Sequence, residues 1–311
     1  MIDIHPLSSF RPGLRLGIDL GGTCVKLALV DEHGRIRALK KLDTPPAPRA
    51  ITPALRKILR SWVKRSLLGT GVGVAGDVNP VSGTVLFAPN LKWRNVPLKR
   101  YLRAAGVPEP IFFDNDATAA AWGAFHVELP GRSQNFVLLT LGTGVGGGLV
   151  LNGRLYHGAT ASAGELGHMV IDRNGPPCCC GSRGCLETYL GGNYLVAWVE
   201  GEMNRLGRKP PADLSPKTIA QRAAQGDKIC LSAWRRAGEA LGTALSNLIN
   251  IFNPDTILLT GGVAAAAPLF LPHARRVVAR NRFVSAPKVV RLRVSTNHRH
   301  LGVIGAALLV E

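Results

Sequence analysis

Twice in this chain, a buried strand is predicted to run into a glycine-rich turn and to resume as a second strand. The two hairpins are Leu14–Asp19 with Val25–Val30 around Gly21-Gly22-Thr23, and Phe136–Leu141 with Leu149–Leu151 around Gly142–Gly148. Short apolar runs bounded by glycines are typical of β-hairpins. Because the two tips lie about 120 residues apart, the pattern predicts an internal duplication of one βββαβα-type unit.

Helical and strand patterns alternate through the rest of the chain. Apolar residues at helical spacing predict helices at Thr52–Leu67, Pro97–Ala105, Ala117–His126, Tyr194–Leu206, Lys228–Phe252, Ala264–Ala279 and Leu301–Val310. Short apolar runs predict strands at Arg35–Lys41, Gly71–Val74, Pro110–Phe113, Thr256–Thr260 and Val289–Val294. Strands that alternate with helices predict an α/β fold, here with two lobes.

The composition fits a globular protein. The chain has 311 residues, 46% of them hydrophobic, and no apolar run approaches the roughly 20 residues that a membrane-spanning helix needs. Met1–Arg15 lacks the long apolar stretch of a secretory signal, so we expect a cytoplasmic protein without a membrane partner. Four of the six cysteines cluster between Cys178 and Cys185, whereas Cys24 and Cys230 stand alone and are expected to be buried, inert thiols.

The net charge of +18 predicts attraction to polyanions. The basic residues are scattered, although denser at 35–65 and 275–299, and no nucleic-acid-binding motif accompanies them. We interpret them as a solvated basic surface and expect no nucleic-acid partner. Binding of a long phosphate polymer stays open as an alternative.

The first glycine turn has the residue types of a phosphate site. Glycines at Gly21 and Gly22 let backbone N–H groups approach an anion, and the hydroxyl of Thr23 adds a donor. Asp19 is a candidate ligand for Mg²⁺ on the phosphates, and Lys26 adds positive charge. The alternative is that the glycines serve only the tight turn.

The second glycine run is not a dinucleotide fingerprint. A Rossmann loop leads from a strand into a helix, whereas Leu149–Leu151 continues as a strand after Gly142–Gly148. A third glycine pair, Gly261-Gly262, follows the strand Thr256–Thr260. The three elements together indicate a nucleotide held between two lobes.

The cysteine cluster indicates a metal. Cys178, Cys179, Cys180 and Cys185 lie in a glycine-containing loop, with His168 upstream. Zn²⁺ takes four Cys or His ligands in a tetrahedron, and a closed set of three Cys and one His is a structural site that leaves no position for a reactive water. The alternative is a set of reduced thiols without metal, and spacing alone leaves open which cysteine is spare.

Asn115-Asp116 follows a predicted buried strand. The carboxyl ends of strands are where α/β proteins place their sites, and a carboxylate there can serve as a general base. Asp116 suits that position, but it equally suits the N-cap of the helix predicted at Ala117–His126. The residues by themselves leave both roles open.

These motifs resemble those of a known family. Asp19–Thr23, Leu141–Gly144 and Leu259–Gly262 are similar to the phosphate loops and adenosine motif of the actin/hexokinase/Hsp70 superfamily. More narrowly, Gly164–His168 with the cysteine cluster to Glu187 resembles the ROK family of bacterial sugar kinases, and the resemblance runs from Leu14 to Ala307. It implies the two-lobed actin-like (ribonuclease H-like) fold. The expected lobes are 1–116 with 298–311, and 117–297 with the zinc loop.

The resemblance also implies a function, namely ATP-dependent phosphorylation of a hexose hydroxyl, with glucose to glucose 6-phosphate the first expectation. Asp116 matches the general base. The implied sugar-binding residues are Gly76, Asn90, Asn115, Asp116, Glu165, His168 and Glu187. The implied nucleotide-binding residues are Asp19, Gly21, Gly22, Thr23, Lys26, Gly142, Thr143, Gly144, Gly261 and Gly262, with Mg²⁺ accompanying ATP at Asp19.

For the metal, the resemblance matches His168, Cys178, Cys180 and Cys185 as ligands of a structural Zn²⁺. Cys179 is then an extra thiol, and Thr118 departs from the family pattern, in which Asn is usual. Asp114 is not a matched position and is expected to be structural. The family also implies a homodimer or a dimer of dimers.

Other functions are compatible with the same motifs. The acceptor could be fructose, allose, N-acetylglucosamine or N-acetylmannosamine, and polyphosphate could replace ATP as the donor, which would suit the basic charge. A sugar-responsive repressor would carry a winged helix-turn-helix domain before the core, and only about thirteen residues precede the first predicted strand. A catalytically dead sugar sensor is disfavoured by intact Asp19, Thr23 and Asp116.

Overall fold

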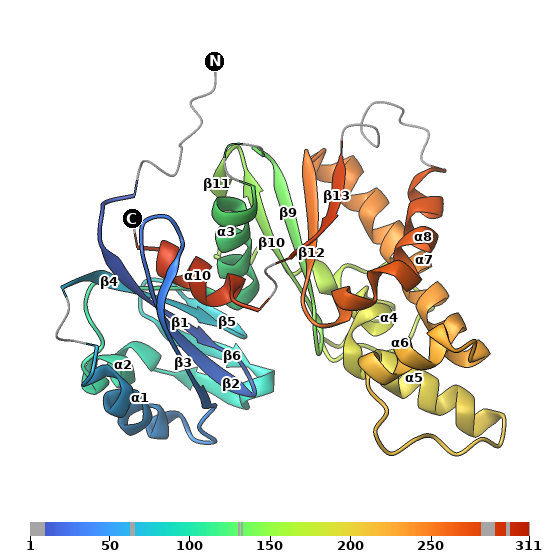
Figure 1. The fold of residues 1–311 in the computed structure, drawn as a ribbon, viewed down its shortest axis with the longest axis horizontal. Coiled ribbons are helices and arrows are strands. Elements are labelled where there is room, and N and C mark those ends of the chain that lie inside the picture. Colours follow the sequence, from blue (N-terminus) through green and yellow to red (C-terminus); the bar gives the residue numbers. More distant parts are fainter. Residues whose placement is uncertain are drawn as a thin grey trace. The chain divides into compact units, whose positions relative to one another are not determined.

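The computed structural model describes the chain apart from residues 1–9, 63–65, 130, 132, 281–289, 297–298 and 311. The chain divides into two compact units (Figure 1). The first unit runs from the N-terminus to Gln134 and includes Gly148–Gly164 and the segment from Arg299; the second comprises Asn135–Gly147 and Glu165–His298. Residues 117–134 and 148–164, which the sequence predicts in the second lobe, belong to this first unit. The predicted lobe boundaries at residues 1, 297, 298 and 311 lie outside the described residues, and so does the predicted start of a strand at residue 289.

The first unit contains a five-stranded sheet in the order β3-β2-β1-β4-β8. Its strands are β1 (Leu14–Leu20), β2 (Cys24–Val30), β3 (Ile36–Asp43), β4 (Leu67–Val74) and β8 (Ile111–Asn115). β1 pairs antiparallel with β2 but parallel with β4, and β4 pairs parallel with β8. The carboxyl ends of β1, β4 and β8 therefore share one edge of the sheet, where Leu20, Val74 and Asn115 lie side by side.

Helices cover both faces of this sheet. α1 (Ile51–Leu59) and α2 (Leu98–Ala105) pack on the face that carries Leu16, Ile18 and Leu20, all completely buried. α10 (Leu301–Leu308) packs on the opposite face and also against α3 (Asp116–Glu128). Gly71 permits the close approach of α10, because a Cβ there would lie 2.6 Å from the carbonyl carbon of Ala306.

The sequence did not predict a small three-stranded meander. β5 (Asp77–Asn79), β6 (Thr84–Ala88) and β7 (Trp93–Val96) form a three-stranded antiparallel sheet. These strands are three to five residues long and mix polar with apolar side chains, so neither length nor alternation distinguishes them from a loop. The 3₁₀ turn Pro89–Leu91 between β6 and β7 carries Asn90.

The second sheet repeats the topology of the first. Its order is β11-β10-β9-β12-β13, which matches β3-β2-β1-β4-β8 strand for strand. The strands are β9 (Phe136–Leu141), β10 (Val145–Leu151), β11 (Arg154–Leu155), β12 (Thr256–Thr260) and β13 (Arg291–Val294). β12 pairs in parallel with both β9 and β13, as β4 does with β1 and β8. The predicted α/β class and the predicted duplication are both confirmed.

In the described part of the second unit, the α-helices are α4 (Glu187–Leu190), α5 (Gly192–Arg205), α6 (Pro216–Ala224), α7 (Lys228–Phe252) and α8 (Ala267–Val278). Asp227 caps α7 by accepting hydrogen bonds from the N–H groups of Ile229 and Cys230. α7 and α8 pack closely, since a Cβ at Gly242 would lie 2.7 Å from the carbonyl oxygen of Ala274. Within the described ranges, no helix has the length and apolarity required to cross a membrane.

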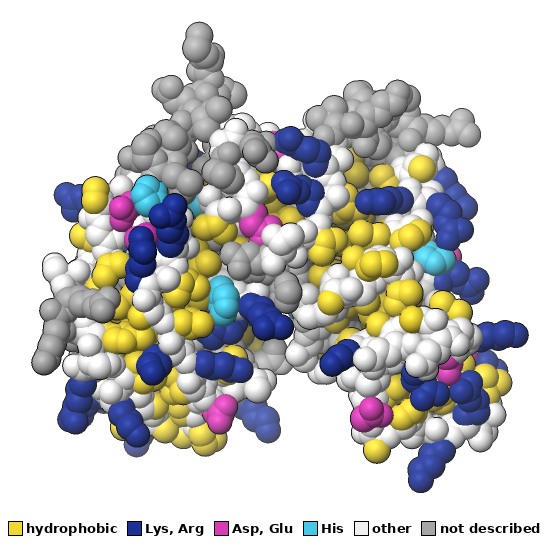
Figure 2. All heavy atoms as spheres, in the orientation of Figure 1, with side chains coloured by type: hydrophobic (Ala, Val, Ile, Leu, Met, Phe, Trp, Pro, Cys, Tyr) yellow, Lys and Arg dark blue, Asp and Glu magenta, His cyan; other side chains and the backbone are white. Residues whose placement is uncertain are grey.

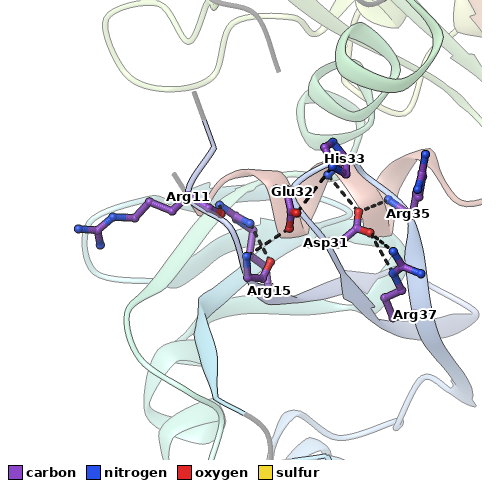
Figure 3. A network of polar contacts seen from close by, with 8 residues as sticks. Arg11, Arg15, Asp31, Glu32, His33, Arg35 and Arg37 are labelled. Carbon is purple, nitrogen blue, oxygen red and sulfur yellow. Dashed lines mark hydrogen bonds and ion pairs between the residues drawn. The ribbon is translucent and has the colours of Figure 1, made fainter. Parts of the chain in front are cut away.

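A buried arginine fastens the C-terminal end of the chain to the first strand. The guanidinium of Arg15 donates to the carbonyl oxygens of Val310 at 2.6 Å, Arg11 at 2.9 Å and Gly13 at 3.1 Å. Figure 3 shows Arg15 beside Arg11 and near the acidic turn that follows β2. The side chain also lies over the ring of Phe10. Arg15 thus holds Val310, two residues beyond the end of α10, the helix that covers the sheet.

The acidic turn after β2 binds basic partners of its own. Asp31 accepts the N–H groups of His33 and Arg35 and forms an ion pair with Arg37 at 2.7 Å (Figure 3). Burial works to raise the pKa of Asp31, but these hydrogen bonds and the Arg37 charge outweigh it and lower the pKa. Other Lys and Arg side chains are spread over the surface in view in Figure 2 rather than gathered in one patch.

Candidate active site and metal centre

The first glycine turn lies at the carboxyl end of β1. The N–H of Gly21 donates to the carbonyl oxygen of Cys24, which closes the turn, and the hydroxyl of Thr44 donates to the carbonyl oxygen of Gly21. Thr23 is exposed at the tip. Asp19 pairs with Lys26 at 3.0 Å across the hairpin, so the charge of Lys26 is directed at this carboxylate.

Asn115 and Asp116 lie at the same sheet edge, where β8 ends and α3 begins. The side-chain oxygen of Asn115 accepts the N–H groups of Ala117 at 2.8 Å and Thr118 at 3.2 Å, so Asn115 is the N-cap of α3. Asp116 is the first residue of the helix, half-buried, with Oδ1 accepting the N–H of Ala117 at 2.9 Å. The capping role that the sequence left open for Asp116 therefore belongs chiefly to Asn115.

Gly76 and Asn90 adjoin these elements. The carbonyl oxygen of Gly76 accepts the side-chain amide of Asn115 at 3.2 Å. A Cβ at Gly22 would lie 3.0 Å from the Cβ of Asn90, so Asn90 sits against the glycine turn. The structure therefore brings Gly22, Gly76, Asn90, Asn115 and Asp116 to one edge of the first unit.

Asp114 has a partner that the sequence analysis missed. Its Oδ2 lies 2.8 Å from Nε2 of His157, and its Oδ1 accepts the N–H of Asn115 at 2.8 Å. Asp114 is only 5% exposed. The hydrogen bond to Asp114 raises the pKa of His157 and outweighs the opposing effect of burial. No local sequence signal links two residues that are 43 positions apart.

The second glycine turn, in the second unit, carries a carboxylate. The N–H of Gly142 donates to the carbonyl oxygen of Gly144, and the N–H of Val145 donates to Oε2 of Glu187 at 2.8 Å. Glu187 lies so close to Gly144 that a Cβ there would collide with its carboxylate. Glu187 is thereby fixed beside the predicted phosphate loop.

The third glycine pair packs on the strand that leads into this turn. Gly261 has φ +97° and lies against the backbone of Leu141. The N–H of Gly192, at the start of α5, donates to the carbonyl oxygen of Gly142 at 2.9 Å. A Cβ at Gly142 or Gly262 would meet no atom within 4 Å. The second and third glycine elements thus meet within the second unit, with open space beside them.

Four predicted metal ligands converge in the second unit. The ligand atoms of His168, Cys178, Cys180 and Cys185 all lie within 4.8 Å of one another. Nδ1 of His168 lies 3.5 Å from Sγ of Cys178, and the Sγ atoms of Cys180 and Cys185 lie 3.7 Å apart.

These distances match a zinc tetrahedron. With Zn–S of about 2.3 Å and Zn–N of about 2.0 Å, two sulfurs lie about 3.8 Å apart and a sulfur and a nitrogen about 3.5 Å. The loop turns at Gly181 and Gly184, both with positive φ. Burial, followed by hydrogen bonds to the neighbouring thiols, raises the pKa of Cys185 to about 12. A bound cation would favour the thiolates instead.

The extra thiol points elsewhere. Sγ of Cys179 lies 3.5 Å from Oε1 of Glu187, and its N–H donates to the hydroxyl of Tyr194 at 3.0 Å. Burial and then the charge of Glu187 raise the pKa of Cys179 to about 11. His168, Cys179 and Glu187 form a second group of ligand atoms within 4.8 Å, so the side chains of the cysteine loop and the predicted sugar-binding carboxylate are neighbours.

The remaining predicted residues lie near these elements. Glu165 is exposed and precedes the 3₁₀ turn Leu166–His168, and its carbonyl oxygen accepts the N–H of His168. Thr118, where the family pattern has Asn, is 3% exposed, and its N–H donates to Asn115. Cys230 is buried as predicted, whereas Cys24 is only partly buried.

Known proteins are similar to this chain in sequence and in fold. The sequence model of the ROK family matches residues 15–311. The chain belongs to the ROK family. Glucokinase from Streptomyces coelicolor is 34% identical to it over 275 residues, which cover 85% of this chain and 86% of the relative. A putative xylose repressor from Caldicellulosiruptor sp. is 33% identical over 313 residues, which cover 96% of this chain and 78% of the repressor.

Among solved structures, this ROK chain resembles a ROK family glucokinase from Streptomyces griseus in complex with glucose and AMPPNP. The TM-score is 0.80 at 32% identity, with 96% of this chain and 99% of that chain covered. The predicted ROK resemblance and the two-lobed α/β fold that it implied are confirmed.

Proposed function

We propose that this ROK protein is an ATP-dependent glucose kinase that forms glucose 6-phosphate. The observation that carries the proposal is the strand-end group of the first unit. Asn115 caps α3 and so places Asp116 as the first residue of the helix, at the sheet edge where β1 ends in its glycine turn. The glucokinase from Streptomyces griseus, bound to glucose and AMPPNP, supports the choice of sugar and donor.

In the proposed reaction, Asp116 accepts the proton of the attacking sugar hydroxyl. The oxygen of that hydroxyl forms a bond to the γ-phosphorus, the bond from that phosphorus to the β–γ bridging oxygen breaks, and ADP leaves. A positioned carboxylate of this kind contributes about 10² to 10⁴ in rate. Mg²⁺ bound with ATP would neutralise phosphate charge, and we assign the partly buried carboxylate of Asp19 to it.

The nucleotide would be held mainly by backbone groups. We assign the phosphates to the two turns Gly21-Gly22-Thr23 and Gly142-Thr143-Gly144, whose threonines are exposed at the tips. Glycine turns present several N–H groups to an anion, and the hydroxyls of Thr23 and Thr143 add donors. We assign Lys26 to the same site, because its positive charge lies 3.0 Å from the carboxylate of Asp19. Gly261-Gly262 is assigned to the adenosine, because Gly262 has open space beside its α-carbon.

We assign the sugar hydroxyls to six side chains and one backbone group: Asn90, Asn115, Asp116, Glu165, His168, Glu187 and the backbone of Gly76. Carboxylates and amides suit this role because each can bond two neighbouring hydroxyls, and an analogue that lacks one hydroxyl leaves a polar group unpaired. Glu187 already accepts the N–H of Val145 through Oε2, which fixes its orientation.

We further propose that His168, Cys178, Cys180 and Cys185 hold a structural Zn²⁺. A closed set of one His and three Cys leaves no coordination position for substrate or water, so this metal performs no chemistry. Its role would be to shape the loop that leads into Glu187. His168 would bind through Nδ1, the nitrogen that faces Cys178, and Nε2 stays available for a sugar hydroxyl.

A panel of sugars tests the function. Purified protein is assayed with ATP and Mg²⁺ by coupled ADP release, and kcat/KM is compared for glucose, fructose, allose, N-acetylglucosamine and N-acetylmannosamine. We expect the highest kcat/KM with glucose. A higher value for another sugar would replace glucose as the substrate. Polyphosphate in place of ATP is the donor control, and product formation from it would revise the donor.

A sugar-responsive regulator is the competing function, because the putative xylose repressor from Caldicellulosiruptor sp. is nearly as similar as the glucokinase from Streptomyces coelicolor. ADP release that depends on glucose separates the two, since a regulator binds sugar without turnover. The predicted cytoplasmic location and homodimeric assembly stay predictions.

A further inference from the structure

His157 pairs with Asp114, and Asp114 immediately precedes Asn115 and Asp116 in the chain. His157 stands in the segment that connects β11 to Gly164, and Nε2 of its ring lies 2.8 Å from Oδ2 of Asp114, the next-to-last residue of β8. Asp114 is 5% exposed, and the side chain of His157 is 41% exposed. A carboxylate so deeply buried needs charged or hydrogen-bonding partners, and His157 supplies one of them.

The other partner of Asp114 belongs to the site. Oδ1 of Asp114 accepts the backbone N–H of Asn115 at 2.8 Å. The Asn115 side chain in turn donates to Gly76 and accepts from Ala117 and Thr118 at the start of α3. A continuous chain of hydrogen bonds therefore runs from His157 through Asp114 and Asn115 to the helix that begins with Asp116.

His157 also organises the segment that leads to Glu165. Its carbonyl oxygen accepts the N–H of Ala163 at 3.1 Å, which closes residues 157–163 into a loop. A Cβ at Gly158 would lie 3.1 Å from the Cβ of Ala163, so the loop is tightly packed at its base. Gly164 and Glu165, the start of the family motif, follow at once. One residue thus fixes both the end of β8 and the segment before Glu165.

The carboxylate of Asp114 favours the protonated form of His157. The pair lies at one wall of a cavity of about 820 Å³ within the first unit. Among the described residues, the other titratable side chains that line this cavity are Arg154 and His126. Burial lowers the pKa of His126 to about 4, so it is neutral near pH 7 and adds no charge. In the same loop, the hydroxyl of Ser162 donates to Oδ1 of Asp77 at 3.5 Å. Within the described residues, His157 forms its ion pair with Asp114.

We propose that His157 is a positioning residue for phosphoryl transfer, and that its imidazolium holds Asp114 so that Asn115 and Asp116 keep their orientation at the start of α3. The proposal rests on the proposed kinase function. A shift of the reacting groups by a fraction of an ångström lowers the rate of a positioned reaction more than it lowers substrate affinity. His157 therefore acts on kcat through Asp114, without touching the substrate.

The charge on His157 gives this role a pH dependence. The pKa of His157 is raised above 6.5, so the folded protein keeps the imidazolium to a higher pH than a free histidine would. The positioning effect is present below pH 6.5 and is lost as the pH rises through the raised pKa. We expect kcat to fall on this alkaline side.

The experiment compares the full-length wild type with His157→Gln and His157→Arg, in glucose and ATP assays from pH 6 to pH 9.5. Gln keeps a hydrogen-bond donor without the charge, and Arg keeps the charge at every pH. His33→Gln is the matched control, since His33 is an exposed histidine that forms an ion pair with Glu32.

We expect His157→Gln to lower kcat by about tenfold near pH 6.5, with KM for ATP unchanged, and to remove the alkaline fall. His157→Arg restores at least part of kcat and shows no alkaline fall either. If His157→Gln keeps the wild-type kcat and pH profile while its melting temperature falls, the pair is only structural and the proposal is wrong. A wild type without sugar turnover overturns the proposed function, and the positioning role with it.

Discussion

The two groups of proposed sugar-binding residues are held in place by opposite means. In the first unit, Asn115 and Asp116 follow a buried strand of a five-stranded sheet and open a helix whose N-cap is satisfied. In the second unit, the cysteine loop has almost no core of its own, and between Val170 and Arg183 only Gly175 and Cys178 are buried. The first group relies on packing and hydrogen bonds, whereas we propose that the second relies also on a metal held by the ligands that converge from His168 to Cys185.

The two groups would therefore have different tasks, namely the chemical step in the first unit and binding of the sugar hydroxyls in the second. Phosphoryl transfer needs a base whose position is fixed closely, and a sheet edge beneath a capped helix provides that rigidity. The carboxylate of Glu187, which we propose binds a sugar hydroxyl, can be placed by a loop, provided that the proposed metal orders the loop. Asp116→Asn and His126→Phe test the first unit, and Cys180→Ser and Glu187→Gln test the second.

The largest effect is expected from Asp116→Asn. It removes the proposed base and keeps the size of the side chain, so kcat should fall by about 10² to 10⁴ with little change in glucose affinity. Coupled ADP release measures the rate, and isothermal titration measures the affinity. Asp213→Asn, an exposed carboxamide change in the second unit, is the control. Wild-type turnover in Asp116→Asn would remove Asp116 from the reaction.

Next comes the metal. Cys180→Ser should lose the stoichiometric zinc of the wild type and weaken glucose binding, because metal binding at a closed site contributes directly to folding of the loop. Cys179→Ser is the matched control: it changes the neighbouring thiol, which faces Glu187, and should keep its zinc. Metal content per protein is measured by mass spectrometry. Equal zinc in the two variants would contradict the ligand set.

A smaller effect is expected from Glu187→Gln. The amide keeps an oxygen for the N–H of Val145 but loses the charge that bonds the sugar hydroxyls. KM for glucose should rise by about tenfold, with a smaller change in kcat, which is typical of a lost ground-state contact. Glu239→Gln, exposed on α7, serves as the control. A loss confined to kcat would move Glu187 from binding to chemistry.

The smallest effect concerns stability in acid. His126 is 6% exposed, contacts the rings of Phe10, Trp122 and Phe125, and has no hydrogen-bond partner for Nε2 in the described part of the chain. Because burial lowers its pKa from 6.5 to about 4, the unfolded chain binds a proton first as the pH falls. Stability is therefore lost between pH 6.5 and pH 4, by about 3 kcal/mol at most.

Urea unfolding of the wild type and of His126→Phe at pH 7.5, 5.5 and 4.5 measures this loss. The variant should lose less stability than the wild type on acidification. The same difference should persist after chelation, because His126 belongs to the first unit and not to the cysteine loop. An equal acid loss in both proteins would mean that His126 is not the group responsible.

The sequence predicted correctly the elements that a continuous apolar or amphipathic pattern defines. α7 occupies Lys228–Phe252 and β12 occupies Thr256–Thr260, the ranges that were predicted. The four zinc ligands were predicted from the family resemblance and are brought together by the structure. The bounds of these elements and the set of zinc ligands could be predicted because the informative residues lie near one another in the chain.

What the sequence could not provide was contact between distant residues. Nothing near His157 indicates Asp114 as its partner, and nothing near Val145 indicates that its N–H binds Glu187. The meander β5–β7 escaped because its strands are too short and too polar for a periodic pattern. The sequence also left open whether Asp116 caps α3 or serves the reaction, and it did not predict that the Asn115 side chain accepts the N–H groups of Ala117 and Thr118.

The most direct test measures glucose binding to Asp116→Asn, with its zinc and after removal of zinc by a chelator. The zinc-loaded variant should bind glucose with a Kd close to that of the wild type, although it does not turn over. Removal of zinc should weaken glucose binding by about tenfold or more, which corresponds to about 1.4 kcal/mol. Unchanged affinity after zinc removal, or loss of affinity in the zinc-loaded variant, would contradict the division between a catalytic strand end and a metal-ordered sugar-binding loop.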